Sequence, residues 1–233
     1  MLANQFTHVI LFNRMSNIER LLEIRFNDKM LEARNRLWHV LCTDFFQQFI
    51  NQNETVLDMG AGCCEFINNI ICKKKYAMDV NEKLMKYARQ EVQILIGESS
   101  KASTLLNGEK VNVVFLSNFL EHIPTKDKLV HTLEEIKKIL KADGKLLILQ
   151  PNIRYCYKNY WDFFDHYIPL SHKSLEEILT ALDFKIIVMK PKFLPFSTKS
   201  RLPLHPLLVK MYLKFTPIQL VIGKQMFIYA MKR

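Results

Sequence analysis

One stretch of the chain combines acids and glycines at a spacing suited to ligand binding. An apolar run ends on Asp58, and Gly60 and Gly62 follow at once. This pattern predicts a buried strand, a tight turn and a helix start with unpaired N–H groups. The acids Asp58 and Glu65 on either side of the turn would repel a diphosphate. The turn therefore favours a nucleoside ligand that carries a cation, although a glycine turn after a buried strand can also be purely structural.

The same stretch resembles the first motif of the class I S-adenosylmethionine-dependent methyltransferases, an apolar strand followed by Asp-x-Gly-x-Gly-x-Gly. Cys64 stands where that motif has its third glycine, which is a departure from the family pattern. The resemblance implies S-adenosylmethionine as the cofactor. It assigns these residues of the turn to cofactor binding: Asp58, Gly60, Ala61, Gly62 and Glu65.

Residues at two further predicted strand ends extend this expected cofactor site. Asp79 ends a predicted strand at 74–79, where the resemblance implies that it accepts hydrogen bonds from both ribose hydroxyls. Val80 would then pack against the adenine, and Glu98, after a predicted strand at 92–96, would face the adenine amino group. A role for Asp79 in capping the next helix is compatible with this assignment.

A second family-like motif follows the predicted fourth strand at 112–118. The sequence Phe-Leu-Glu-His-Ile-Pro at 119–124 resembles the fourth motif of small-molecule methyltransferases. The resemblance implies that Asn118 and Phe119 lie beside the methionine part of the cofactor. His122 would either reach toward the transferred methyl group or hold the loop by hydrogen bonds.

The stretch 151–167 concentrates aromatic, acidic and histidine side chains, and its polarity argues against a core position. We expect a loop on the ligand side of the sheet, with packing onto the N-terminal helices as the alternative. The residues expected to recognise the substrate are Tyr160, Trp161 and Asp162.

A histidine is the expected catalytic base, because its unperturbed pKa lies closest to neutrality. His166 is the first candidate, oriented by Asp162 or Asp165, and His122 is the second.

The order of predicted elements indicates an α/β fold: a Rossmann-like, doubly wound, mostly parallel seven-stranded sheet with helices on both faces. Apolar residues at helical spacing from 17 to 50 predict an N-terminal helical leader, residues 1–53. Residues 54–233 would form the methyltransferase domain, with substrate-side insertions near 151–170 and 191–223. The resemblance implies an antiparallel seventh strand at 225–232, and the apolar stripe at 207–215 predicts a lid helix.

Length and composition bound the remaining alternatives. A chain of 233 residues can form one large domain. No apolar stretch reaches the roughly 20 residues that cross a bilayer, and the start lacks a signal-peptide pattern, so we expect a cytoplasmic protein. The five cysteines fit neither a disulfide framework nor paired zinc ligands. We expect them to be reduced, and we expect no metal site.

The net charge of +10 lies entirely in the C-terminal part, because residues 184–233 contain ten Lys or Arg and no acid. A solvated face is one interpretation, and an anionic partner is the other. We expect peripheral docking on an anionic membrane surface or on a lipid-linked acceptor, with these cations taking part: Lys199, Arg201, Lys210 and Lys214.

The expected reaction is methylation of an oxygen atom on a small molecule, a sugar or a lipid-linked acceptor. A nucleic-acid methyltransferase that uses the basic end is the alternative. The predicted fourth strand, however, ends in Ser-Asn-Phe-Leu and not in the Asn/Asp-Pro-Pro-aromatic form of amino-group methyltransferases. Loss of the third glycine leaves a non-catalytic binding protein as a further alternative.

Overall fold

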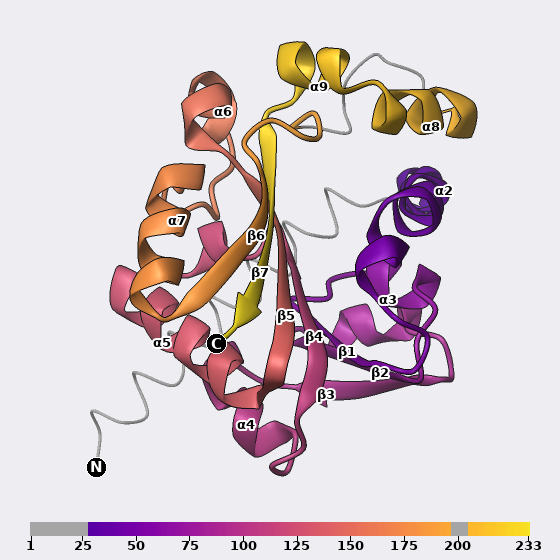
Figure 1. Cartoon of the computed structure of the whole chain (residues 1–233). Helices are drawn as coiled ribbons and strands as arrows, with labels where there is room; N and C mark the ends of the chain where they lie inside the picture. The colour runs from indigo at the N-terminus through magenta and orange to yellow at the C-terminus, as the bar shows by residue number, and fades with distance from the viewer. Residues whose placement is uncertain (1–27, 197–204) are drawn as a thin grey trace, which may run out of the picture.

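The computed structural model of the chain describes residues 28–196 and 205–233. They form a seven-stranded sheet in the order β3-β2-β1-β4-β5-β7-β6, with helices on both faces (Figure 1). The strands are β1 (Thr55–Met59), β2 (Lys74–Asp79), β3 (Val92–Ile96), β4 (Val111–Ser117), β5 (Leu140–Pro151), β6 (Phe184–Lys190) and β7 (Gln225–Lys232). Strands β1 to β5 pair in parallel, whereas β7 runs antiparallel between β5 and β6. The predicted Rossmann-like α/β fold is confirmed.

Eight α-helices and four short 3₁₀ segments connect the strands in the described part of the chain. The helices are α2 (Asp28–Asp44), α3 (Glu65–Asn69), α4 (Ala102–Leu105), α5 (Lys126–Ile139), α6 (Ile153–Tyr160), α7 (His172–Ala181), α8 (Pro206–Lys214) and α9 (Thr216–Ile222). The 3₁₀ segments are η1 (Phe46–Phe49), η2 (Glu82–Tyr87), η3 (Ser99–Lys101) and η4 (Leu120–His122). The predicted loop at 151–167 therefore contains a helix, α6, which begins at an Asn152 side-chain cap.

Each face of the sheet has its own apolar core. On one face α5 and α7 pack against the strands, and on the other α2, α3 and η1 do so (Figure 1). The second core is rich in aromatic rings, and Phe66 of α3 stacks on Phe115 of β4 with ring centroids 3.7 Å apart. Each buried ring stabilises the fold by roughly 1.5–3 kcal/mol, so α2 and η1 are integral to the sheet core. Residues 1–27 of the predicted leader lie outside the described residues.

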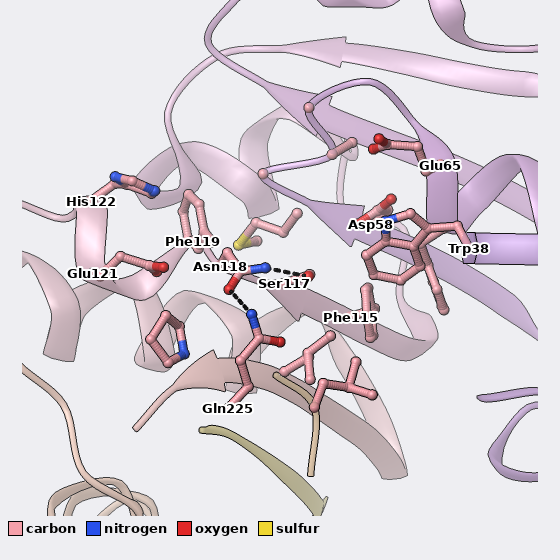
Figure 2. A pocket seen from close by; sticks show the side chains of 18 of the residues that line it. Trp38, Asp58, Glu65, Phe115, Ser117, Asn118, Phe119, Glu121, His122 and Gln225 are labelled. Atoms are coloured by element: carbon pink, nitrogen blue, oxygen red, sulfur yellow. Dashed lines mark hydrogen bonds between the residues drawn. The ribbon is translucent and has the colours of Figure 1, made fainter. Parts of the chain in front are cut away.

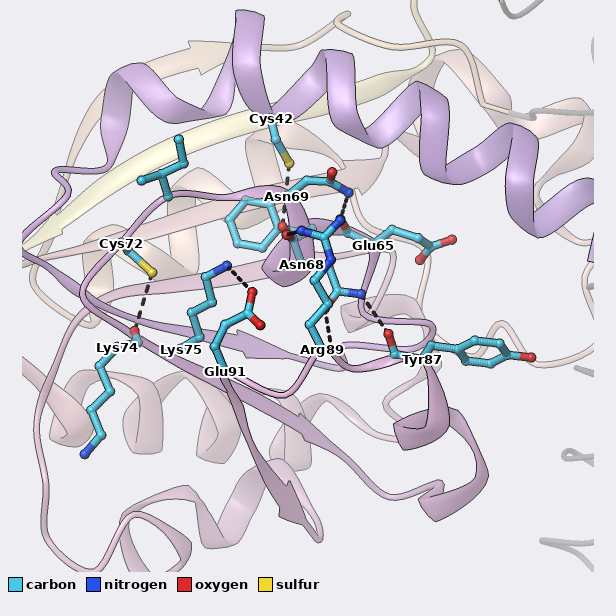
Figure 3. A network of polar contacts seen from close by, with 12 residues as sticks. Cys42, Glu65, Asn68, Asn69, Cys72, Lys74, Lys75, Tyr87, Arg89 and Glu91 are labelled. Carbon is cyan, nitrogen blue, oxygen red and sulfur yellow. Dashed lines mark hydrogen bonds and ion pairs between the residues drawn. The ribbon is translucent and has the colours of Figure 1, made fainter.

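A polar network ties α3 to the chain before β3 (Figure 3). Asn68 donates a side-chain hydrogen bond to the carbonyl of Tyr87 (2.8 Å) and accepts one from the backbone N–H of Arg89 (3.0 Å). The Arg89 guanidinium donates in turn to the Asn68 carbonyl at 2.9 Å. These bonds hold α3 in place at the end of the glycine turn.

In the described part of the chain, no helix has both the length and the apolar character needed to cross a membrane.

Candidate active site

The glycine turn between β1 and α3 adopts a conformation that depends on its glycines. Gly60 and Gly62 have φ values of +74° and +51°, a region that side chains with a Cβ rarely occupy. A Cβ on Gly60 would lie 2.4 Å from Cδ2 of Phe119, whereas a Cβ on Gly62 would meet nothing within 4 Å. Phe119 therefore packs directly on the turn, and the space over Gly62 is open to a ligand.

Cys64, at the position of the third family glycine, also has a positive φ of 59°. The backbone thus follows the glycine-type path although the residue carries a side chain, which is buried at the start of α3. Cys64 thus holds the left-handed conformation that a glycine adopts readily.

Two acids on this side of the pocket differ in how their charge is balanced. Glu65 forms a 2.6 Å ion pair with Arg34 of α2. The two residues are 31 positions apart, and the sequence pattern does not reveal this contact. Asp58 is only 3% exposed, and burial followed by the charge of Glu65 raises the pKa of its carboxyl well above the usual range. A cation bound beside Asp58 would favour the ionised carboxylate.

Asp79 ends β2 as predicted and connects two parts of the site. One carboxylate oxygen accepts the Gly62 N–H at 3.0 Å, and the other accepts the Asn81 N–H at 3.0 Å. Each oxygen retains a lone pair for a further donor. The side chain therefore supports the glycine turn and still faces the pocket, where Val80 and Glu98 also lie.

Asn118 occupies the end of β4 with a positive φ of 47°. Its N–H donates to the Leu149 carbonyl at 2.9 Å, and its side-chain oxygen accepts from Gln225 of β7 at 3.1 Å (Figure 2). Gln225 is 107 residues away in the chain and was not among the sequence candidates. This amide pair links β7 to the end of β4, where the methionine part of the cofactor is predicted to lie.

One cavity of about 1760 Å³ joins these features. It is lined by every predicted cofactor residue: Asp58, Gly60, Ala61, Gly62, Glu65, Asp79, Val80, Glu98, Asn118 and Phe119. Small-molecule pockets usually measure about 300–1,000 Å³. The cavity is therefore large enough for a nucleoside cofactor and a second molecule together.

Both candidate bases, His122 and His166, line the same cavity, with ring centroids 5.2 Å apart. The Nδ1 atom of His122 lies 2.8 Å from the Asp165 carbonyl oxygen and 3.5 Å from its carboxylate. Because a carbonyl can only accept, Nδ1 carries the proton and Nε2 keeps a lone pair. Asp165 thus contacts and orients His122, the second of the two predicted bases.

The three predicted substrate residues do not reach the cavity. Tyr160 is fully buried and donates its hydroxyl to the Ile168 carbonyl at 2.5 Å. Trp161 is 57% exposed at the outer surface, and Asp162 accepts a hydrogen bond from Asn159. Residues 153–160 form a helix that turns Tyr160 inward, so the stretch is partly core and not wholly the predicted loop. Residues of the following segment line the cavity instead: Phe163, Asp165, His166 and Tyr167.

Glu121 is a further residue of the cavity wall that sequence reasoning did not single out. It is 1% exposed, and Gln150 of β5 donates a 2.5 Å hydrogen bond to its carboxylate. Burial raises the pKa of this carboxyl above its usual value. The sequence feature that could have identified Glu121 is its position in the fourth-motif stretch, directly before His122. Figure 2 shows Glu121 and His122 together on one side of the pocket, with Asp58, Glu65 and Trp38 on the other.

Comparison with known proteins agrees with this geometry. Residues 57–148 match the family model of a methyltransferase domain. No curated protein matches the chain at a significant level.

Solved structures share the fold. A SAM-dependent methyltransferase from Archaeoglobus fulgidus superposes with a TM-score of 0.60 at 19% identity, covering 89% of this chain and 96% of that one. The plantazolicin methyltransferase, solved with a monoazolic desmethylPZN analogue and SAH, gives a TM-score of 0.61 at 13% identity, with coverages of 94% of this chain and 91% of that one. A complex of the Haloferax volcanii Trm112 methyltransferase activator with a methyltransferase gives 0.61 at 13% identity, with coverages of 86% and 92%.

The family match begins within β1 and includes the glycine turn and β4, which all contribute residues to the cavity wall. The chain accordingly contains a methyltransferase domain at 57–148, on the fold of the class I S-adenosylmethionine-dependent methyltransferases, and S-adenosylmethionine is its cofactor.

Proposed function

We propose that the enzyme methylates a hydroxyl oxygen on a small molecule with a long apolar portion, such as a lipid-linked acceptor. The observation that carries this proposal is the apolar wall opposite the glycine turn. It is formed by the segment after β6 and by α8 and α9, through these residues: Leu194, Phe196, Leu208, Met211, Tyr212, Phe215, Ile218 and Ile222. An apolar acceptor gains about 0.8 kcal/mol for each CH₂ group that it buries there.

The cofactor half of the cavity supports a definite orientation of the donor. In this proposal Asp79 accepts the ribose hydroxyls and Glu98 faces the adenine, which Val80 covers. Asn118 and Phe119 flank the methionine part, and Asp58 and Glu65 provide negative charge near its ammonium group. The methyl group then points toward His122 and His166, which line the remaining space.

The chemistry required of the protein is positioning and removal of one proton. When bound, the cofactor supplies an electrophilic methyl group on a sulfonium. The acceptor oxygen forms the new C–O bond as the S–C bond breaks, and the sulfonium becomes a neutral thioether. The lone pair on Nε2 of His122 supports this residue, with His166 beside it, as the acceptor of the hydroxyl proton.

The outer surface of α8 and α9 supports an amphiphilic acceptor. Leu207 on α8 and Leu220 and Val221 on α9 do not line the cavity and are 59%, 58% and 78% exposed. Exposed apolar patches typically mark surfaces that contact a partner. Lys210 and Lys214 lie on α8, and residues 184–233 contain no acid. We propose that these helices rest on an anionic bilayer from which the acceptor enters. Lys199 and Arg201 lie outside the described residues.

The test compares acceptors that share one hydroxyl-bearing head group and differ in their apolar chain. With radiolabelled S-adenosylmethionine, we expect kcat/KM to rise at least about tenfold from a short-chain to a long-chain acceptor. Met211→Glu should reduce this preference, while Trp161→Glu, on an exposed surface away from the cavity, should not. Equal rates for both acceptors, or methyl transfer to RNA or DNA alone, would refute the proposal.

A further inference from the structure

Two adjacent potential metal ligands and a third that lies more than forty residues later in the chain meet at the acceptor end of the cavity. Glu121 and His122 belong to η4, and His166 lies in the segment after α6. One ligand atom from each of these residues lies within 4.8 Å of the other two. Two ligands that are each about 2.1 Å from one ion are about 3.4 Å apart in a tetrahedral arrangement. Side-chain rotations that move the ligand atoms by about an ångström would therefore bring the three around one ion.

The hydrogen bonds around His122 already prepare it as a ligand. Its Nδ1–H donates to the Asp165 carbonyl at 2.8 Å, which leaves the lone pair on Nε2. Metal-binding histidines almost always donate their second ring N–H to a carbonyl or carboxylate in this way, because the bond fixes the tautomer and the ring orientation.

Glu121 gives an independent reason to expect a cation. It is 1% exposed, and its nearest polar partner is the neutral amide of Gln150 at 2.5 Å. Among the described residues, no Lys or Arg forms an ion pair with it. Buried carboxylates are normally paired with a cation or coordinate a metal.

We propose that Glu121, His122 and His166 bind a divalent first-row transition-metal ion. Two imidazoles and one carboxylate suit Mn²⁺, Fe²⁺, Co²⁺ or Zn²⁺ better than Mg²⁺, which prefers oxygen ligands. Three protein ligands leave coordination positions open. Since all three residues line the cavity, the open positions face the space that the methyl acceptor would occupy.

The role of the ion deepens the proposed O-methylation and rests on it. The acceptor hydroxyl would coordinate the ion, which lowers the pKa of the hydroxyl and releases its proton to water. The resulting oxygen would then attack the methyl carbon as the S–C bond breaks. In this arrangement the histidines act as ligands, and the ion replaces a side chain as the means of activating the oxygen.

The first test measures metal binding in the absence of any acceptor. Chelator-treated protein is titrated with Mn²⁺ by electron paramagnetic resonance and with Co²⁺ by visible absorption. We expect saturation at one ion per chain, and a loss of affinity of at least about ten- to a hundredfold in His122→Ala and His166→Gln. His39→Ala is the matched control, because the His39 side chain is exposed, bonds to Asn69 and does not line the cavity. A calorimetric titration with S-adenosylmethionine verifies that each variant is folded.

Two results would overturn the metal site. One is equal Mn²⁺ affinity in wild type and both variants. The other is a thiolate-to-cobalt absorption band, which would place the ion on cysteines such as Cys63 and Cys64.

The second test separates this inference from the proposed function. Methyl transfer to the long-chain hydroxyl acceptor is measured after chelation and after return of Mn²⁺ or Zn²⁺. Activity that is lost and then restored supports both proposals. Full activity in the chelated enzyme refutes the metal site and leaves O-methylation intact. Saturable metal binding without transfer to any hydroxyl acceptor refutes O-methylation and leaves the metal site intact.

Discussion

The two ends of the cavity are built in different ways. The cofactor end rests on backbone: two glycines with positive φ, and Asp79 bonded to the N–H groups of Gly62 and Asn81. The acceptor end rests on side chains from segments far apart, such as His122 and Asp165, 43 residues apart. Backbone hydrogen bonds fix the shape of the cofactor end, which suits a site for one common cofactor. Side chains on helices can vary while the sheet stays the same, so the acceptor end is where specificity resides.

The largest expected effect tests the acceptor end alone. Replacing His122 or His166 by alanine should lower kcat by about 10² to 10⁴, since removal of an acid–base group or of an activating ligand costs that much. Cofactor affinity should stay within about twofold, because neither side chain belongs to the turn. Single-turnover methyl transfer and calorimetry with S-adenosylmethionine measure the two quantities. A variant that loses cofactor affinity as much as rate would mean that the two ends are not independent.

Asp79→Asn tests the cofactor end. The variant keeps one side-chain oxygen, which can accept only one of the two N–H groups that Asp79 bonds, and it loses the charge. Each charge-assisted hydrogen bond contributes roughly 1.5–3 kcal/mol. The affinity for S-adenosylmethionine should therefore fall about ten- to a hundredfold, with kcat nearly unchanged at saturation. Glu91→Gln is the control, because Glu91 is exposed and pairs with Lys75 away from the cavity. Unchanged affinity in Asp79→Asn would remove the ribose assignment.

Asp58 gives a prediction for pH. Burial and Glu65 raise the pKa of its carboxyl in the folded protein, so the folded state holds the proton more tightly than the unfolded state. This contribution to stability is complete below the unfolded pKa of about 3.9 and is lost as pH rises through the raised pKa. Without cofactor, Asp58→Asn should therefore be more stable than wild type near pH 7, with an advantage that shrinks toward pH 4.

Urea unfolding of the two proteins at both pH values measures this difference. Added S-adenosylmethionine should reverse the order at pH 7, since its ammonium group favours the ionised carboxylate of the wild type. A stability advantage for Asp58→Asn that is the same at both pH values would contradict the titration argument.

The smallest effect concerns the outer face of the acceptor end. Each cation near an anionic surface adds about 1 kcal/mol, so the pair Lys210→Gln and Lys214→Gln should weaken vesicle binding by about tenfold or more. Co-sedimentation with anionic and neutral vesicles at low and high salt measures it, and salt should release the protein. Lys173→Gln on α7 is the control, because it also replaces an exposed lysine by a neutral glutamine. Equal binding to both vesicle types would leave these lysines as a solvated face.

The cofactor end could be predicted because its chemistry is local in the chain. Asp58, Gly60 and Gly62 lie within one strand–turn unit, and a parallel sheet brings the carboxyl ends of its strands to one edge. Asp79, Glu98 and Asn118 follow predicted strands, so a strand assignment was enough to bring them to the cavity. The antiparallel β7 followed from the family resemblance, whereas the strand order comes from the structure.

The acceptor end depended on contacts that local patterns do not encode. Tyr160 was predicted in a polar loop, but the Asn152 cap and contacts of α6 with the rest of the fold make it a buried helix residue. Its buried position is thus a case of tertiary packing overriding composition.

The sequence by itself determined the fold class, because the periodicity of the strands and the conformational needs of a glycine turn are properties of short segments. The cofactor followed from the resemblance of that turn to the first family motif. Only the tertiary structure decided which side chains meet. Arg34 balances Glu65, Gln225 holds Asn118, and His166 joins Glu121 and His122. Each of these contacts joins segments separated by thirty to more than a hundred residues. Their formation depends on how the helices pack on the sheet, which no single segment specifies.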